Sequence, residues 1–268
     1  MEGVLSVVAG LLIGSFLNVC VYRLPRDMSV TWPGSRCTTC GHAIAWYENV
    51  PVVSYLLMRA RCRHCRAGIA WRYPAVEAVT AALFLLGYLT WGPSAGAVKF
   101  AVFAALLVGM IVSDLETRIL PDEFTKGGMA AGFVASFLVP IPDSVMAVFL
   151  PGVDRRVSSL VEAGVAAGLA SGALWGVGVV YSKLREKEGL GFGDVKMVAM
   201  MGAFLGLPAT LAAVMFGCIA GSVLGLGYIW ATKKDAATYE LPFGSFLGAA
   251  AIVVGLTSEG MLHWYRGM

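Results

Sequence analysis

Charged side chains are scarce in this sequence. Only 14% of its 268 residues are charged, whereas an ordinary soluble domain carries about a quarter. Hydrophobic residues instead make up 58% of the chain. This balance excludes an ordinary soluble domain and indicates a polytopic helical membrane protein.

The first apolar run lacks the features of a cleaved signal peptide. Glu2 stands where such a peptide carries basic residues, and no small-x-small cleavage site follows. We therefore expect this run to remain as the first membrane span. The sequence also shows no evident internal repeat, and the polar segment 23–73 has no Gly-rich nucleotide-binding signature.

Long apolar runs organise most of the chain. A helix needs about 20 residues to cross a hydrocarbon core of about 30 Å. The runs cover residues 4–22, 75–91, 95–113, 124–139, 160–181, 195–231 and 243–256. Run 195–231 is too long for one crossing and contains Pro208, so it predicts two helices. The sequence thus predicts an all-α polytopic membrane protein with about eight transmembrane helices.

Basic residues predict the orientation, because positively charged loops stay in the cytoplasm. Segment 23–73 carries eight arginines, which places it in the cytoplasm and the N-terminus outside. Alternation then places most later basic residues inside, namely Arg118, Lys183, Arg185, Lys187, Lys233 and Lys234. The exceptions are Arg155, Arg156 and Arg266. Because the arginines of segment 23–73 are dispersed among aromatic residues, we expect them to face anionic lipid rather than nucleic acid.

Segment 23–73 contains two Cys-x-x-Cys pairs. Cys37 and Cys40 form the first pair, and Cys62 and Cys65 form the second after 21 intervening residues. This spacing is typical of two knuckles that share one tetrahedral Zn²⁺, and Gly41 supplies the backbone freedom that a knuckle needs. Two disulfides or four idle thiols are the alternatives, but the cytoplasm keeps thiols reduced. The pattern predicts a zinc-ribbon-like insertion with a structural metal.

These features predict three parts of the chain. Residues 1–22 are the first transmembrane helix, residues 23–73 the zinc-binding insertion with its four cysteines, and residues 74–268 a bundle of seven helices.

Two carboxylates end apolar runs that are expected to reach the same membrane face. Asp114 follows the third run, and Asp194 lies in GFGDVK before the sixth. Two aspartates that share a proton can activate water for amide hydrolysis, one as base and the other as acid. The alternative is that both are helix caps or loop residues, as we expect for Asp122.

The residues around Asp194 add to this hypothesis. Gly191 and Gly193 would let backbone approach an extended substrate. Lys196 would reach lipid headgroups or stabilise a carboxylate.

Several motifs together resemble a known family. GFGDVK resembles the Gly-x-Gly-Asp motif of intramembrane aspartyl proteases. The combination of GSFLNVCVYRLPR (14–26), the two Cys-x-x-Cys pairs, RYPAVE (72–77), SDLETRILPDEFT (113–125) and LPFGSFLG (241–248) resembles the type IV prepilin peptidases. Thr38 and Ser245 depart from that pattern, since the family often has Pro at both places. We expect neither departure to touch the chemistry.

The resemblance implies a bifunctional enzyme of the bacterial cytoplasmic (inner) membrane. It would remove the short basic leader of type IV prepilins or type II secretion pseudopilins with Asp114 and Asp194. It would then N-methylate the new terminus with S-adenosylmethionine, whose contacts cannot be assigned from these residues. Two alternatives stay open: a Gly-x-Gly-Asp protease for other membrane substrates, and a non-enzymatic protein that uses the aspartates as an ion or proton relay.

Overall fold

The computed structural model describes residues 1–142, 144–186, 190–233 and 241–257 with their side chains, and the backbone of 258–266. Lys187, Lys234 and the side chain of Arg266, for which an orientation was predicted, lie outside the described residues. The described part is helical and contains no strand, only two isolated antiparallel bridges. The all-α prediction is confirmed.

Every predicted apolar run lies on a helix. The helices are α1 (Glu2–Arg23), α3 (Arg72–Trp91), α4 (Ala95–Thr117), α5 (Asp122–Leu138), α7 (Arg155–Arg185), α8 (Phe192–Leu205), α9 (Leu207–Thr232) and α10 (Phe243–Arg266). Among the described residues, five helices are long and apolar enough to cross a membrane: α1, α3, α4, α7 and α9. Helices α5 and α8 have 17 and 14 residues, and the described apolar part of α10 is Phe243–Thr257. The chain is a multi-pass membrane protein.

Short helices fill two of the connections. The segment after α1 contains the 3₁₀ helices η1 (Leu24–Arg26) and η2 (Trp46–Glu48) and the helix α2 (Val53–Leu57). Helix α6 (Val145–Phe149) lies between α5 and α7.

The long run 195–231 is divided at a glycine. Gly206 ends α8 and begins α9 with a φ of 77°, a left-handed conformation that suits glycine. Pro208 lies in the first turn of α9, where its missing N–H costs no helical hydrogen bond. The prediction of two helices is confirmed, and the break lies two residues before the proline.

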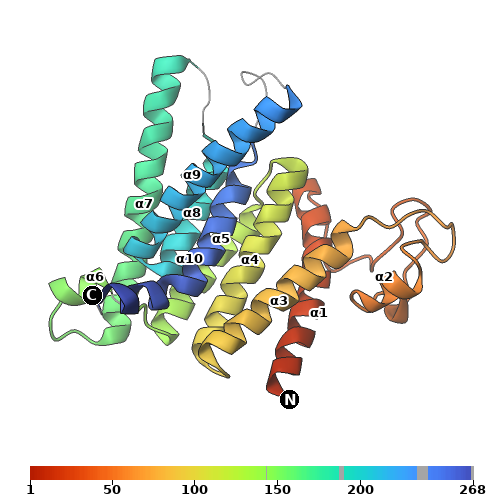
Figure 1. The fold of residues 1–268 in the computed structure, drawn as a ribbon, viewed down its shortest axis with the longest axis horizontal. Coiled ribbons are helices and arrows are strands. Elements are labelled where there is room, and N and C mark those ends of the chain that lie inside the picture. Colours follow the sequence, from red (N-terminus) through yellow and green to blue (C-terminus); the bar gives the residue numbers. More distant parts are fainter. Residues whose placement is uncertain (143, 187–189, 234–240, 267–268) are drawn as a thin grey trace. The chain divides into compact units, whose positions relative to one another are not determined.

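The chain forms two compact units, Met1–Val112 and Ser113–Met268. In the first unit α1 and α3 pack side by side (Figure 1). A Cβ atom at Gly10 would lie 2.5 Å from Ala81 Cα, and one at Gly14 would lie 2.7 Å from Glu77 Cα. The two glycines, four residues apart on one face of α1, therefore let the helix backbones touch.

In the second unit α8 is the central helix and contacts α5, α7, α9 and α10 (Figure 1). Nearly all its residues from Val195 to Phe204 are buried, as expected of a helix that is apolar on every side. A Cβ atom at Gly202 would lie 2.5 Å from the nitrogen of Ala167 on α7. This close packing fixes the direction of α8, and so the position of its first turn.

Candidate functional site

Asp114 lies in the last turn of α4 and is buried, with 6% of its surface exposed. Its backbone carbonyl accepts the N–H of Arg118 at 3.0 Å. The neighbouring Ser113 donates its hydroxyl to the carbonyl of Ile119 at 2.7 Å. These two bonds fix the turn that follows α4 and hold the Asp114 carboxylate in place.

Asp194 lies in the first turn of its helix, α8, whereas Asp114 lies in the last turn of α4. Gly191 is the residue that begins this helix, and its carbonyl accepts the Asp194 N–H at 3.1 Å. The Asp194 side chain is half-buried, whereas Gly191 is exposed. A Cβ atom at Gly193 would press on Leu120 at 3.2 Å, so this glycine allows the chain after α4 to pass close to α8.

The two carboxylates meet at Gly244, in the first turn of α10. A Cβ atom there would lie 3.1 Å from Asp194 Oδ1 and 3.3 Å from Asp114 Oδ2. A single methyl group would thus touch both carboxylates. The structure therefore brings together Asp114 and Asp194, which are 80 residues apart in the sequence.

Ser245 is the residue of this site that sequence reasoning misjudged. Its backbone N–H and its hydroxyl both donate to Asp114 Oδ2, each at 2.8 Å. The expectation that this departure from the family pattern does not touch the chemistry is wrong. The motif LPFGSFLG included this residue, but nothing in the sequence indicated its partner, because the contact joins residues 131 positions apart.

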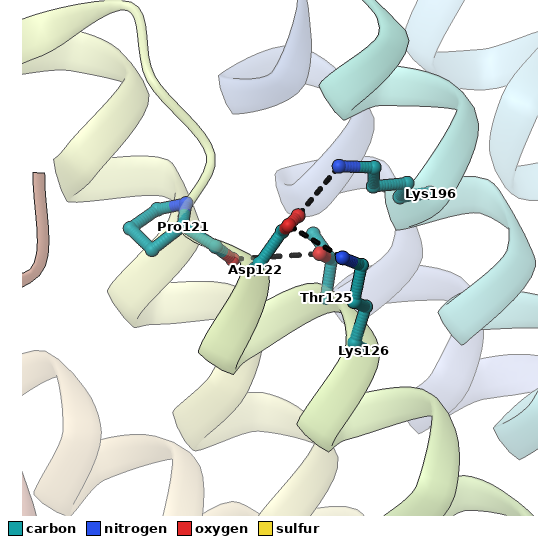
Figure 2. A network of polar contacts seen from close by, with 5 residues as sticks. All are labelled: Pro121, Asp122, Thr125, Lys126 and Lys196. Atoms are coloured by element: carbon teal, nitrogen blue, oxygen red, sulfur yellow. Dashed lines mark hydrogen bonds and ion pairs between the residues drawn. The ribbon is translucent and has the colours of Figure 1, made fainter.

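Lys196 does not reach the Asp114–Asp194 pair but forms an ion pair with Asp122 (Figure 2). Its Nζ lies 2.5 Å from Asp122 Oδ1, and Nζ of Lys126 lies 2.7 Å from Asp122 Oδ2. The ammonium groups of Lys126 and Lys196 hold the pKa of Asp122 below its usual value. Asp122, interpreted from the sequence as a cap or loop residue, therefore stays ionised to more acidic pH than an isolated aspartate and joins α5 to α8.

The four cysteines of the insertion form one cluster. Their sulfur atoms all lie within 4.8 Å of one another, and Sγ of Cys37 is 3.8 Å from Sγ of Cys65. Four sulfurs at about 2.3 Å from one Zn²⁺ in a tetrahedron are about 3.8 Å apart, whereas a disulfide needs about 2.05 Å. All four cysteines are free, so the arrangement matches a metal site and not two disulfides.

Each cysteine pair sits in a tight hairpin. The N–H of Cys37 donates to the carbonyl of His42 at 2.9 Å, and that of Cys62 donates to Ala67 at 2.8 Å. The residue after the second cysteine has a left-handed backbone in both, with φ of 70° at Gly41 and 62° at Arg66. The need for backbone freedom at Gly41 is thus confirmed, and Arg66 adopts the same conformation despite its side chain.

The two hairpins are copies of one sequence unit. Residues 36–46 read RCTTCGHAIAW and residues 61–71 read RCRHCRAGIAW, with six of eleven positions identical. The expectation of no internal repeat is wrong. The signal was present in the sequence, but the unit is shorter than the repeats of solenoid proteins.

The thiols cannot all be ionised without a cation. The backbone N–H groups of Cys40 and Thr39 lower the pKa of Cys37 to about 6. The amide of Ala67 favours the Cys65 thiolate too, but burial and the neighbouring sulfurs raise the pKa of Cys65 to about 11. A divalent cation would remove this repulsion, so the donor set fits Zn²⁺.

Comparisons with known proteins cover both units. The family described as "Bacterial Peptidase A24 N-terminal domain" matches residues 8–91, and the "Type IV leader peptidase family" matches residues 100–226. The chain belongs to the type IV leader peptidase family. No solved structure matches this chain.

Several curated relatives of this chain are named "Prepilin leader peptidase/N-methyltransferase". The protein of Burkholderia pseudomallei (strain 1026b) is 34% identical over 95% of this chain and 86% of its own length. The protein of Pseudomonas putida is 31% identical over 95% and 90%. The protein of Myxococcus xanthus (strain DK1622) is 40% identical over 85% of this chain but only 63% of its own length.

The names of the relatives imply a methyl donor, but the residues that line the cavity of the first unit do not suit one. That cavity has a volume of about 280 Å³ and lies between α1 and the loops 30–35 and 49–51. The described residues that line it include no carboxylate to face the positive charges of S-adenosylmethionine. Its one cation, Arg23, already donates to three backbone carbonyls. We therefore assign no residue to the methyl donor.

Proposed function

We propose that this protein is a membrane-embedded aspartic endopeptidase that cleaves the leader from prepilins or type II secretion pseudopilins and also N-methylates the product. The observation that carries the proposal is the meeting of the Asp114 and Asp194 carboxylates at Gly244. The family and the names of its relatives support prepilins as the substrate class and methylation as the second activity.

The two carboxylates can hydrolyse a peptide bond with a single water molecule. The ionised carboxylate accepts a proton from the water, whose oxygen attacks the scissile carbonyl carbon. The protonated carboxylate gives its proton to the carbonyl oxygen, which yields a neutral diol. When the diol collapses, the first carboxyl returns its proton to the amide nitrogen and the C–N bond breaks. The second carboxylate recovers a proton from the diol, so the pair ends as it began.

The surroundings of Asp194 suit an extended substrate. Gly191 is exposed and has an extended backbone, with φ of −68° and ψ of 134°. Without a side chain it leaves room for another extended chain beside the carboxylate. Lys196 supports the site through Asp122 and does not contact the Asp114–Asp194 pair.

We assign the cysteine cluster a structural zinc ion. Cys37, Cys40, Cys62 and Cys65 would supply four thiolates, and the bound ion would join the two hairpins of a segment that has little apolar core of its own. With all four ligands from the protein, no position stays open for catalysis. The insertion, residues 23–73, is then the cytoplasmic part associated with methylation, and residues 74–268 form the peptidase bundle.

The arginines of the insertion support its place on the cytoplasmic side of the bacterial inner membrane, against anionic lipid. With this orientation both aspartates lie near the cytoplasmic membrane face. A prepilin presents a charged leader followed by an apolar helix, so its scissile bond would reach the same depth.

Co-expression with a tagged prepilin tests the proposal. Wild type, Asp114→Asn and Asp194→Asn would be compared by gel shift for leader removal and by mass spectrometry of the pilin N-terminus. We expect wild type to give a shortened pilin that carries one added methyl group. Each variant should leave the prepilin uncut, because either substitution removes one half of the shared-proton pair.

The controls distinguish the alternatives. Asp122→Asn, outside the Asp114–Asp194 pair, should retain cleavage above the level of either catalytic variant. Cleavage of other membrane substrates in preference to prepilins would indicate a protease of different specificity. A folded, membrane-inserted wild type that cuts nothing, and whose ion flux depends on the aspartates, would replace this proposal with an ion relay.

A further inference from the structure

The first turn of α10 contributes polar groups to the Asp114–Asp194 pair that no catalytic motif contains. We propose that Ser245 is a positioning residue that holds the Asp114 carboxylate in a fixed orientation beside Asp194 through two hydrogen bonds. This inference deepens the proposed function and rests on it.

The hydrogen bonds of the two carboxylates are unequal. Asp114 Oδ2 accepts both the backbone N–H and the hydroxyl of Ser245, each at 2.8 Å. Both residues are buried, with 6% of Asp114 and 8% of Ser245 exposed. Of the described residues, none donates to the Asp194 carboxylate. Hydrogen bonds to a carboxylate are strong where water is excluded, so these two bonds fix the orientation of the Asp114 carboxylate.

The position of Ser245 in its helix explains the first of these bonds. It is the third residue of α10, where backbone N–H groups have no partner within the helix. Its N–H is shared between Asp114 Oδ2 at 2.8 Å and the carbonyl of Pro242 at 3.1 Å. Gly244, one residue earlier, leaves the space in which the two carboxylates approach each other.

Among the described residues, no other charged side chain forms a hydrogen bond or an ion pair with Asp114. Asp194 on α8 lies beside it at Gly244. Lys196 on α8 and Lys126 on α5 are held by Asp122. Glu116 on α4 and Arg118, directly after that helix, are exposed. The described side chains of α10, Phe243 to Thr257, include no ionisable group.

A pair of variants at this position tests the inference. Ser245→Thr keeps both donors, whereas Ser245→Ala keeps only the N–H. We expect kcat to fall about 10-fold in the Ala variant, with KM little changed. The Thr variant should match wild type.

The measurement would use purified full-length protein in detergent with a synthetic prepilin, after its thermal stability has been confirmed. Ser171→Ala, which removes a hydroxyl that donates to the carbonyl of Ala167 in its own helix, serves as the control and should leave kcat unchanged. If Asp114→Asn is inactive while a stable Ser245→Ala variant keeps the wild-type kcat, the inference is overturned and the proposed function survives. If Asp114→Asn still cleaves, the proposed function itself fails.

Discussion

At the scale of single residues, Arg66 shows what the hairpins of the cysteine cluster require. Its φ of 62° is disfavoured for any residue with a Cβ atom, and the matching position in the other hairpin is Gly41. The donated amides and the grouping of the four sulfur atoms therefore maintain a conformation that Arg66 does not itself favour. The side chain is exposed, so its replacement removes no buried contact.

We predict that Arg66→Gly is more stable than Arg66→Ala by about 1 kcal/mol, since only glycine adopts this conformation without strain. Both substitutions remove the same charge, so their difference isolates the backbone. At Arg61, whose φ is not positive, the order should reverse, because glycine has more freedom to lose on folding. Thermal unfolding of the zinc-loaded protein measures the difference between the Gly and Ala variants at each position. Loss of the metal to a chelator gives a second measure of the same difference. An Ala variant at 66 as stable as Gly would show that the hairpin is not strained.

The residues of the site differ in how far the sequence could predict them. Asp114, Asp194 and the four cysteines carry chemistry in local patterns, so the sequence pointed to each. Ser245 lies in the motif LPFGSFLG, but its contact with Asp114 is long-range, and a serine at the start of a helix does not indicate such a partner. The same holds for Glu162, a fully buried carboxylate that accepts the N–H of Leu207 at the start of α9.

At the scale of elements, glycines determine which helices approach closely. Gly10 and Gly14 allow contact between α1 and α3, and Gly202 allows contact between α8 and α7. Apolar runs predicted the helices, but hydropathy alone does not say which faces meet. The ion pair of Asp122 and Lys196 likewise links α5 to α8, and its partners were not evident from the sequence.

We predict that Gly10→Ala destabilises the protein whereas Gly96→Ala does not. The added methyl group at Gly10 would lie 2.5 Å from the backbone of Ala81, so α1 and α3 must move apart. At Gly96 in α4 the nearest atom would be 3.5 Å away, which is ordinary contact, and alanine favours a helix by about 1 kcal/mol over glycine. Thermal unfolding in detergent should therefore shift down for the first variant and slightly up for the second. Equal shifts would argue against close packing of α1 on α3.

At the scale of the whole molecule, the length of α8 bears on where hydrolysis can occur. Its 14 residues span about 21 Å, less than the roughly 30 Å of a hydrocarbon core. The helix is surrounded by α5, α7, α9 and α10 and need not match the lipid thickness itself. Its first turn, with Asp194, can therefore lie below the membrane surface, where fewer waters compete and the two carboxylates interact more strongly.

The expected orientation of the chain predicts on which side of the membrane each loop lies. Reporter domains fused after Met28, Pro93, Arg118 and Gly152 should lie inside, outside, inside and outside in that order, because the basic residues after α1 and α4 hold those loops in the cytoplasm. The fusion after Gly152 is the decisive one, since α5 has only 17 residues and the two arginines that follow, Arg155 and Arg156, oppose this placement. If that reporter lies inside, α5 does not cross the membrane. Helix α7 would then begin on the cytoplasmic side, and α8 would present Asp194 to the opposite face from Asp114, which their shared contact with Gly244 does not allow.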